Sequence, residues 1–291
     1  MELNYIITES DENIKQILKN KFNMSDRYIL KLKKNQCIFI NDFPVFINYT
    51  IHVNDKLKII DNLEENSSNI ISNSIINFNI LYEDDYLLIV DKPAGIPVHP
   101  SILHYENSLS NGIKYYFDKI GLKKKIRPVN RLDKDTSGIV LFAKNEYIQE
   151  CLIKQMKSNI FKKHYIAVLE GILDNLSGTI NAPIARKEGS IIEREINRNG
   201  EVAISHYKVI KKLDTMTLVE FTLETGRTHQ IRLHCKYIGH PIVGDFLYGN
   251  NSELIDRQAL HAYKVEFIHP VSRKKISIKS NIPEDICHLC K

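Results

Sequence analysis

Long apolar runs and a leader-like start are both missing from this sequence. Its 291 residues contain no stretch of about 18 apolar residues, the length that a membrane-spanning helix needs. The first residues, MELNYIITESDE, lack the basic segment and the apolar segment that mark a signal peptide. We therefore expect a cytoplasmic protein with no membrane partner.

Paired cysteines are scarce as well. The chain has five cysteines, an odd and scattered set, so a disulfide framework is not expected. Cys287 and Cys290 form one C-x-x-C pair near the C-terminus, whereas a structural zinc site usually needs a second pair. Two free thiols are the preferred interpretation, and no metal is predicted.

The overall composition is that of an ordinary globular protein. Hydrophobic residues make up 43% and charged residues 26% of the chain, which is enough to bury a core. Lysine and arginine number 40 against 35 acidic residues, a formal net charge of +5. This modest excess only slightly favours an anionic partner.

The first 60 or so residues contain the pattern of a small separate unit. Ser10 is placed to cap a helix whose apolar residues, Ile14 to Phe22, recur at helical spacing. Ser25 is placed to cap a second helix that runs through Lys34, and two short strands are expected at residues 37–41 and 56–60. The second helix carries four cations: Arg27, Lys31, Lys33 and Lys34.

This order of elements, with Ile40-Asn41 in the first strand, resembles an S-four-type domain, a small RNA-binding module of a ribosomal small-subunit protein. The resemblance implies that the four cations of the second helix bind RNA. Asn35, Asp42 and Asn54 stand where that family usually has glycine, and Asn and Asp tolerate left-handed backbone better than most residues. The alternative is a small helical cap with a solvated basic face.

The rest of the chain predicts a second, larger domain. A polar segment rich in Asn and Ser follows the first unit and is interpreted as a linker. From Ile75 onward, many strands alternate with short polar turns and a few helices, among them one capped by Asn145 and one from Thr228 to about Tyr237. We expect an α+β fold on a mixed, mostly antiparallel sheet. The predicted domains are residues 1–62 and 77–291, joined by a linker at 63–76.

Three segments differ from ordinary sheet-and-turn sequence. The loop DKPAGIPVHP at 91–100 is stiffened by prolines, and PVNRLDKDTSG at 128–138 places dense charge before an apolar strand. Taken alone, the latter segment is better explained as a solvated turn closed by Gly138. In LETGRTHQIRLH at 223–234, Gly226 permits a sharp turn and Thr228 is placed to cap a helix. His229 and His234 are five residues apart and do not share a helix face, so a metal site there is not expected.

Together, NRLDKDTSG, KHYIAV at 163–168, GRTHQIRLH and GHPIVGD at 239–245 closely resemble the RluA-type RNA pseudouridine synthases. Those enzymes modify large-subunit ribosomal RNA and some transfer RNAs. The resemblance implies the pseudouridine synthase fold, no cofactor and an RNA partner. It departs from the family at Asn130, where His is common. Because of the N-terminal unit, ribosomal RNA is favoured over transfer RNA as the substrate, and we expect a monomer.

The resemblance also implies roles for individual residues. Asp133 is the expected nucleophile, and Arg227 is the guanidinium expected to pair with it and keep it ionised. Tyr165 is expected to stack on a uridine flipped out of the RNA, and Arg131 to fill the vacated place. Two other classes of function stay open: a non-catalytic RNA-binding ribosome assembly factor, and a hydrolase that uses Asp133 and Asp135 as a carboxylate pair.

Overall fold

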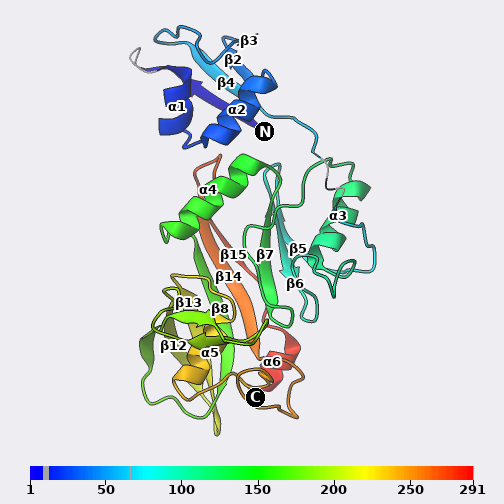
Figure 1. Cartoon of the computed structure of the whole chain (residues 1–291), viewed down its shortest axis with the longest axis vertical. Helices are drawn as coiled ribbons and strands as arrows, with labels where there is room; N and C mark the ends of the chain where they lie inside the picture. Colours follow the sequence, from blue (N-terminus) through cyan, green and yellow to red (C-terminus); the bar gives the residue numbers. More distant parts are fainter. Residues whose placement is uncertain (9–12, 66, 68, 291) are drawn as a thin grey trace.

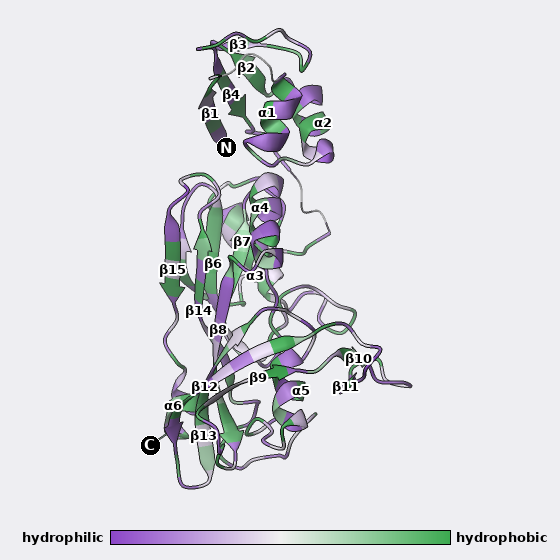
Figure 2. Ribbon diagram, turned by 90° about the vertical axis from the view of Figure 1, so that its left-hand side faces the viewer, coloured by the Kyte–Doolittle hydropathy of each residue, from purple (hydrophilic) through white to green (hydrophobic). Residues whose placement is uncertain are grey.

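A small unit of two helices and four strands stands at one end of the molecule (Figure 1). The computed structural model describes residues 1–8, 13–65, 67 and 69–290. The four strands pair antiparallel in the order β1-β4-β2-β3, and both helices lie on one side of them (Figure 2). The bounds of these elements are β1 Glu2–Ile6, α1 Ile14–Asn20, α2 Asp26–Lys34, β2 Ile38–Ile40, β3 Phe43–Pro44 and β4 Lys56–Ile60.

Local capping explains where the two helices begin. The Ser25 side chain accepts a hydrogen bond from the backbone N–H of Tyr28, so the predicted cap of α2 is confirmed. Helix α1 is capped by Asn13, which exchanges hydrogen bonds with Gln16 in a capping box. The cap predicted at Ser10 lies outside the described residues.

The left-handed turns of this unit follow the sequence prediction at two of three positions. Asp42 and Asn54 have φ values of 68° and 74°. Asn35 instead has φ −100°, and its neighbour Gln36 takes the left-handed conformation with φ 51°. The prediction at Asn35 is therefore wrong by one residue. At that position Asn35 still ends the helix, since its N–H bonds the Lys31 carbonyl.

A nine-stranded, mostly antiparallel sheet dominates the rest of the chain, which confirms the expected α+β fold. Its strands run in the order β5-β6-β7-β14-β8-β13-β12-β9, with β15 added beside β14, and β10 pairs with β11 in a separate hairpin. None of the helices in the described ranges is long and apolar enough to cross a membrane. The bounds are β5 Asn79–Glu83, β6 Leu87–Lys92, α3 Leu109–Lys119, β7 Ser137–Ala143, α4 Glu146–Lys157, β8 Lys162–Glu170, β9 Ser177–Asn181, β10 Ile184–Arg186, β11 Arg194–Ile196, β12 Ile204–Lys212, β13 Met216–Leu223, α5 Gln230–Tyr237, β14 Leu260–Ile268, β15 Lys275–Lys279 and α6 Glu284–His288.

Strand β7 is a buried interior strand of this sheet and positions the loop that precedes it. All seven of its residues are buried, and it pairs antiparallel with β6 and parallel with β14. Gly138 has φ 115°, and a Cβ there would lie 2.3 Å from the Ala262 carbonyl oxygen. Only glycine allows this close approach of the two strands. The charged loop at 130–136 is thereby anchored where β7 begins.

The N-terminal unit packs directly on the large sheet through α4, which faces it in Figure 1. The ring of Tyr28 stacks on that of Tyr147 at 5.8 Å, and Asp61 accepts hydrogen bonds from the Tyr28 hydroxyl and the Asn145 amide. Apolar side chains of both parts belong to one continuous buried cluster. Among the described residues of 61–78 there is no helix or strand, yet Asp61 is only 1% exposed. Asp61 therefore fixes the chain just before the segment interpreted as a linker, while the domain bounds themselves stay a prediction.

Candidate active site

The loop before β7 is held in place by side chains from several elements. Asn130 donates to the Ile139 carbonyl at 3.0 Å and accepts from the Leu141 N–H at 2.9 Å, so both ends of its amide are bound to β7. Arg257 donates to the Asp135 carbonyl at 3.2 Å. These contacts fix the backbone on both sides of Asp133 and leave its carboxylate at the surface of a cavity.

Lys92 anchors the same loop from beneath. Its side chain is fully buried, and its ammonium donates to the carbonyls of Pro93, Ile96 and Lys134 at 2.8, 2.8 and 2.9 Å. Burial lowers the pKa of Lys92 to about 7, although the nearby carboxylates of Asp135 and Asp133 oppose the shift. The stiff segment that begins at Asp91 is therefore tied to the residue that follows Asp133.

Asp133 pairs with Arg232, not with Arg227. The Arg232 Nη1 atom lies 3.4 Å from Oδ2 of Asp133, whose side chain is 21% exposed. Nε and Nη2 of Arg232 each lie 2.7 Å from the fully buried Asp245. Burial acts to lower the pKa of Arg232, but its bonds to Asp245 and the charges of Asp245 and Asp133 outweigh this and raise it. A fixed, permanently charged guanidinium thus faces Asp133.

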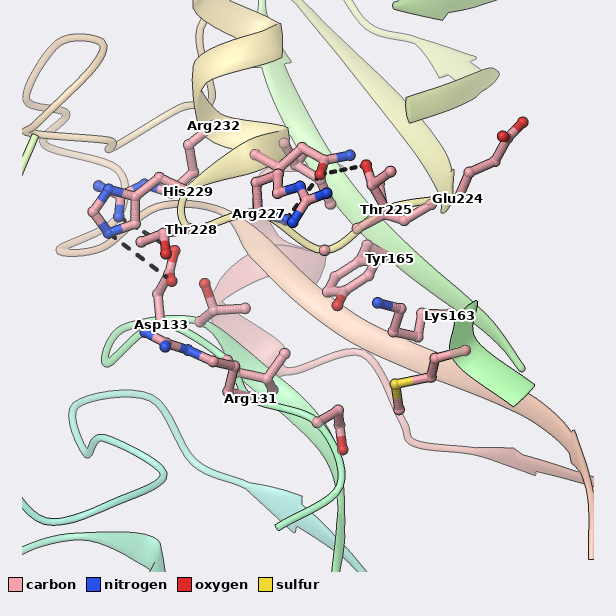
Figure 3. A pocket seen from close by; sticks show the side chains of 18 of the residues that line it. Arg131, Asp133, Lys163, Tyr165, Glu224, Thr225, Arg227, Thr228, His229 and Arg232 are labelled. Atoms are coloured by element: carbon pink, nitrogen blue, oxygen red, sulfur yellow. Dashed lines mark hydrogen bonds and ion pairs between the residues drawn. The ribbon is translucent and has the colours of Figure 1, made fainter. Parts of the chain in front are cut away.

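The predicted pairing of Arg227 with Asp133 is therefore wrong. Arg227 follows β13 and donates hydrogen bonds to the Glu201 carboxylate and the Val202 carbonyl, both at 3.0 Å. It lies two residues before His229, where the backbone turns, whereas Arg232 lies on α5 and projects toward Asp133 (Figure 3). Arg227 still lines the cavity, and its part in the reaction stays a prediction.

The turn into α5 is made by His229, which has φ 58° and stands directly before the helix. The helix therefore begins at Gln230, and the predicted cap at Thr228 is wrong. His229 Nδ1 lies 2.9 Å from the Tyr248 hydroxyl, and Nε2 lies 3.9 Å from Asp133. Burial lowers the pKa of His229, while the charge of Asp133 opposes the shift. Near neutral pH the imidazole is therefore uncharged.

Tyr165 lies on β8 opposite Asp133 in the same cavity (Figure 3). Its side chain is 7% exposed. Burial first, and then the charge of Asp133, raise its pKa well above the ordinary value, so the phenol stays protonated. A neutral aromatic ring at the cavity wall is suited to stacking against a base.

Two cavities meet at the loop that carries Asp133. One has a volume of about 480 Å³ and reaches Tyr165 and the end of α4, and the other, of about 720 Å³, is walled by the loop at 97–101. Both are lined by Asp133 and by Arg131, which is exposed. The structure thus brings together the predicted Asp133, Arg131, Tyr165 and Arg227 around one concave region of a size suited to a nucleotide.

The four cations of α2 lie far from this region along the chain. Two of them are paired with acidic residues of the described ranges, and two are not. Lys31 lies 2.7 Å from Glu65 and 3.7 Å from Glu146 at the junction with the large sheet. Arg27 lies 3.4 Å from Glu146, with its side chain 86% exposed. The side chains of Lys33 and Lys34 are exposed and form no hydrogen bond or ion pair with any residue that the structure describes. Lys31 and Arg27 therefore both pair with acidic residues across the junction, and Lys31 is the more buried of the two.

The histidines near the turn into α5 are hydrogen-bonded, and the cysteines are free thiols. His234 bonds Ser205 and the Ala182 carbonyl, and His240 bonds the Glu170 carbonyl. All five cysteines are free. Within the described ranges, no group of three or more His, Cys, Asp or Glu side chains is arranged to hold a metal ion.

Comparison with known proteins points to one family. The family model described as RNA pseudouridylate synthase matches residues 86–237. The chain is 38% identical to the uncharacterized RNA pseudouridine synthase YhcT of Bacillus subtilis, over 94% of this chain and 91% of that one. It is 34% identical to ribosomal large subunit pseudouridine synthase D of Nitrosomonas europaea, over 88% and 76%. The solved structure of human RNA pseudouridylate synthase domain containing 1 superposes with a TM-score of 0.59 and 26% identity, over 72% and 85%.

Sequence reasoning missed the residues that hold Asp133 in its environment. Arg232, Asp245 and Tyr248 build the guanidinium site, with Arg232 over the Tyr248 ring at 5.2 Å. Arg232 and Asp245 both lie within the segments GRTHQIRLH and GHPIVGD. The charge pattern was therefore visible, but more than one arginine stands near the same turn, and only the folded chain selects between them.

Proposed function

This chain belongs to the RNA pseudouridylate synthase family and is an isomerase, and from that premise we propose that it converts specific uridines of large-subunit ribosomal RNA to pseudouridine. The observation that carries the proposal is the position of Asp133 where the two cavities meet, between a buried guanidinium and the Tyr165 ring. The ribosomal substrate is supported by the similarity to ribosomal large subunit pseudouridine synthase D of Nitrosomonas europaea.

The reaction breaks the bond between the ribose anomeric carbon and N1 of uracil, turns the base over, and joins the same carbon to C5. The proton at C5 leaves and N1 gains one, so product and substrate are isomers and no oxidant, reductant or cofactor is needed. In the proposed mechanism the Asp133 carboxylate stabilises or traps the ribose while the base is detached. Arg232 holds that carboxylate in a fixed direction, because its other nitrogens are bound to Asp245.

Tyr165 and Arg131 account for access to the base. A uridine inside stacked RNA must be flipped out, which costs a few kcal/mol. We assign stacking on the flipped base to Tyr165, worth roughly 1–3 kcal/mol, and occupation of the vacated place to the exposed Arg131. The two contacts together are of the size needed to offset flipping.

The test is to incubate the purified protein with ribosomal RNA transcripts and to analyse the nucleosides. Pseudouridine formed without change in mass supports the proposal. Base loss would indicate a hydrolase, and RNA binding without any new nucleoside would indicate an assembly factor. Pseudouridine mapping of cellular RNA with and without the gene then identifies the nucleotide. Sites missing from transfer RNA alone would overturn the ribosomal assignment.

We further propose that the N-terminal unit binds RNA, in the cytoplasm, as an S-four-type module. The exposed Lys33 and Lys34 and the largely exposed Arg27 supply the charge, while Lys31 contributes to docking. Each phosphate that the protein no longer neutralises should reduce the salt dependence of RNA affinity by up to about one unit of slope. The variant Lys33→Gln/Lys34→Gln should therefore bind with a slope lower by up to about two. An unchanged slope would mean that these lysines form only a solvated basic face.

A further inference from the structure

Lys163 is a partly buried cation of the active-site cavity, and no acidic residue in the described ranges is paired with it. Lys163 lies on β8 two residues before Tyr165, so the two side chains project from the same face of the strand, about 7 Å apart along it. In Figure 3 both point into the cavity that they line together with Asp133. Lys163 therefore stands one strand repeat away from the ring to which base stacking is assigned.

Arg131 and Lys157, which also line this cavity, are exposed to water, whereas the two other cations that are not exposed are paired. Arg232 is bound to Asp245, and Arg227 to Glu201. The ammonium of Lys163, by contrast, forms no hydrogen bond or ion pair with any residue in the described ranges, although its side chain is half-buried. Glu224, a carboxylate on the same cavity wall, lies 2.6 Å from His206 instead.

Lys92, a lysine with a structural role in this fold, differs from Lys163 in its hydrogen bonding. Its three ammonium protons are all donated to backbone carbonyls. Burial lowers the pKa of Lys163 as well, because no opposite charge compensates for the lost water. A partly desolvated ammonium without an acceptor is unfavourable in the free protein, and an incoming anion would relieve that cost.

The surroundings of Lys163 leave room for such an anion. A Cβ on Gly226 would come within 3.0 Å of the Lys163 Nζ atom, so a larger residue at that turn would crowd the ammonium. Met156 and Phe161 line the same end of the cavity and offer no charged acceptor. Lys157, at the end of α4, is exposed at the rim and adds a second positive charge.

We infer that Lys163, supported by Lys157 at the rim, forms a subsite for one phosphodiester of the RNA strand beside the flipped uridine. The inference rests on the proposed function, because RNA is the ligand. A phosphate is favoured over a uracil carbonyl, since each nucleotide that enters the cavity brings a full negative charge and lysine binds phosphate as a point charge. Binding there would fix the strand while Tyr165 holds the base.

The test is a double-mutant cycle between the protein and single phosphates of the RNA. A substrate stem-loop is prepared with one uncharged methylphosphonate at each linkage near the target uridine. Each RNA has a 2′-deoxy sugar on the 5′ side of that linkage, and the reference RNA has the same sugar with a normal phosphate. The ratio kcat/KM for pseudouridine formation is measured with wild type, Lys163→Gln, Lys163→Arg and Lys157→Gln. Thermal unfolding midpoints confirm that each variant is folded.

Lys163→Gln should lower kcat/KM by about 10- to 100-fold, as expected for a charge-assisted hydrogen bond, and Lys163→Arg should restore most of it. One methylphosphonate should lower wild-type kcat/KM similarly yet leave Lys163→Gln unaffected, and Lys157→Gln should have a smaller effect. Additive effects at every linkage would overturn the subsite while leaving the isomerase intact. A wild type that forms no pseudouridine in any RNA would instead overturn the proposed function, and the subsite with it.

Discussion

Two aspartates in this molecule, Asp61 and Asp133, are held in opposite ways. Asp61 is 1% exposed and accepts hydrogen bonds from the Tyr28 hydroxyl, the Asn145 amide and the Leu63 N–H. Asp133 is 21% exposed and has one guanidinium contact at 3.4 Å. Asp61, with its three hydrogen bonds, joins the two parts of the chain. Asp133, with a single guanidinium contact, keeps free lone pairs for a substrate. A carboxylate that is available for chemistry can therefore be distinguished from a structural one by the smaller number of hydrogen bonds that it accepts.

Removal of the Asp133 carboxylate should have the largest effect on activity. Asp133→Asn keeps the shape of the side chain but removes the nucleophile, so turnover should fall by about 10⁴-fold or more while RNA affinity stays near that of wild type. Single-turnover pseudouridine formation and a filter-binding assay measure the two quantities.

Asp135→Asn is the matched control. Asp135 lies in the same loop and lines the larger cavity, and its contact to Arg257 is made through the backbone. This variant should keep activity within a few-fold of wild type. Equal losses in the two variants would mean that both carboxylates act in the reaction, and appreciable turnover by Asp133→Asn would contradict the proposed mechanism.

The next largest effect on activity should distinguish Arg232 from Arg227, the arginine that the sequence predicts as the partner of Asp133. Arg232→Lys cannot keep two bonds to Asp245 and also present a charge to Asp133, so kcat should fall by about 10- to 100-fold. Arg227→Lys alters a partly exposed pair with Glu201 and should cost less than about fivefold. Activity is compared per folded molecule, since Arg232 is buried. A larger loss in Arg227→Lys would favour the pairing of Arg227 with Asp133 that the sequence predicts.

Removal of the Asp61 carboxylate should lower the stability of the fold and leave the chemical step unchanged. Asp61→Ala leaves the Tyr28 hydroxyl and the Asn145 amide without their shared acceptor, which should lower the free energy of unfolding by about 2–4 kcal/mol. Asp42→Asn changes an exposed pair with Lys58 in the same unit and should cost less than about 1 kcal/mol. Denaturant unfolding curves measure both. Equal costs would mean that Asp61 does not hold the junction.

The pH dependence of stability provides the finest comparison. Burial alone would raise the pKa of Asp61, but the hydrogen bonds from Tyr28, Asn145 and the Leu63 N–H outweigh it and hold the pKa below the ordinary 3.8. A pKa lower in the folded than in the unfolded state stabilises the fold at higher pH, and this contribution is lost as pH falls below 3.8. The stability difference between wild type and Asp61→Asn should therefore shrink with acidification. A difference that stays constant down to the acid transition would contradict this account.

The Asp61 junction also limits what a truncation can show. Deletion of residues 1–62 would remove the partners of Tyr147 and Asn145 and expose apolar surface of α4. A fall in activity of such a chain would reflect damage to the large sheet as well as weaker RNA binding. The paired substitution of Lys33 and Lys34 tests the binding of RNA without opening the junction.

Local patterns determined much of this protein from sequence alone. Strand segments separated by short polar turns predicted a sheet-rich domain from Ile75 onward, and the caps at Ser25 and Asn145 set the starts of two helices. The motif around Asp133 was visible because its charge density precedes an apolar strand. These features depend on residues within a few positions of one another, so the chain itself specifies them.

The tertiary structure decided the features that join distant residues. Arg232 and not Arg227 faces Asp133, because the left-handed turn at His229 sets the direction of α5. Lys31 meets Glu65 across the junction, and Asn130 replaces the common His by bonding β7 with both ends of its amide. No local pattern selects among several similar side chains. Backbone geometry determines which of these side chains come together, and each buried charge must have a partner among them.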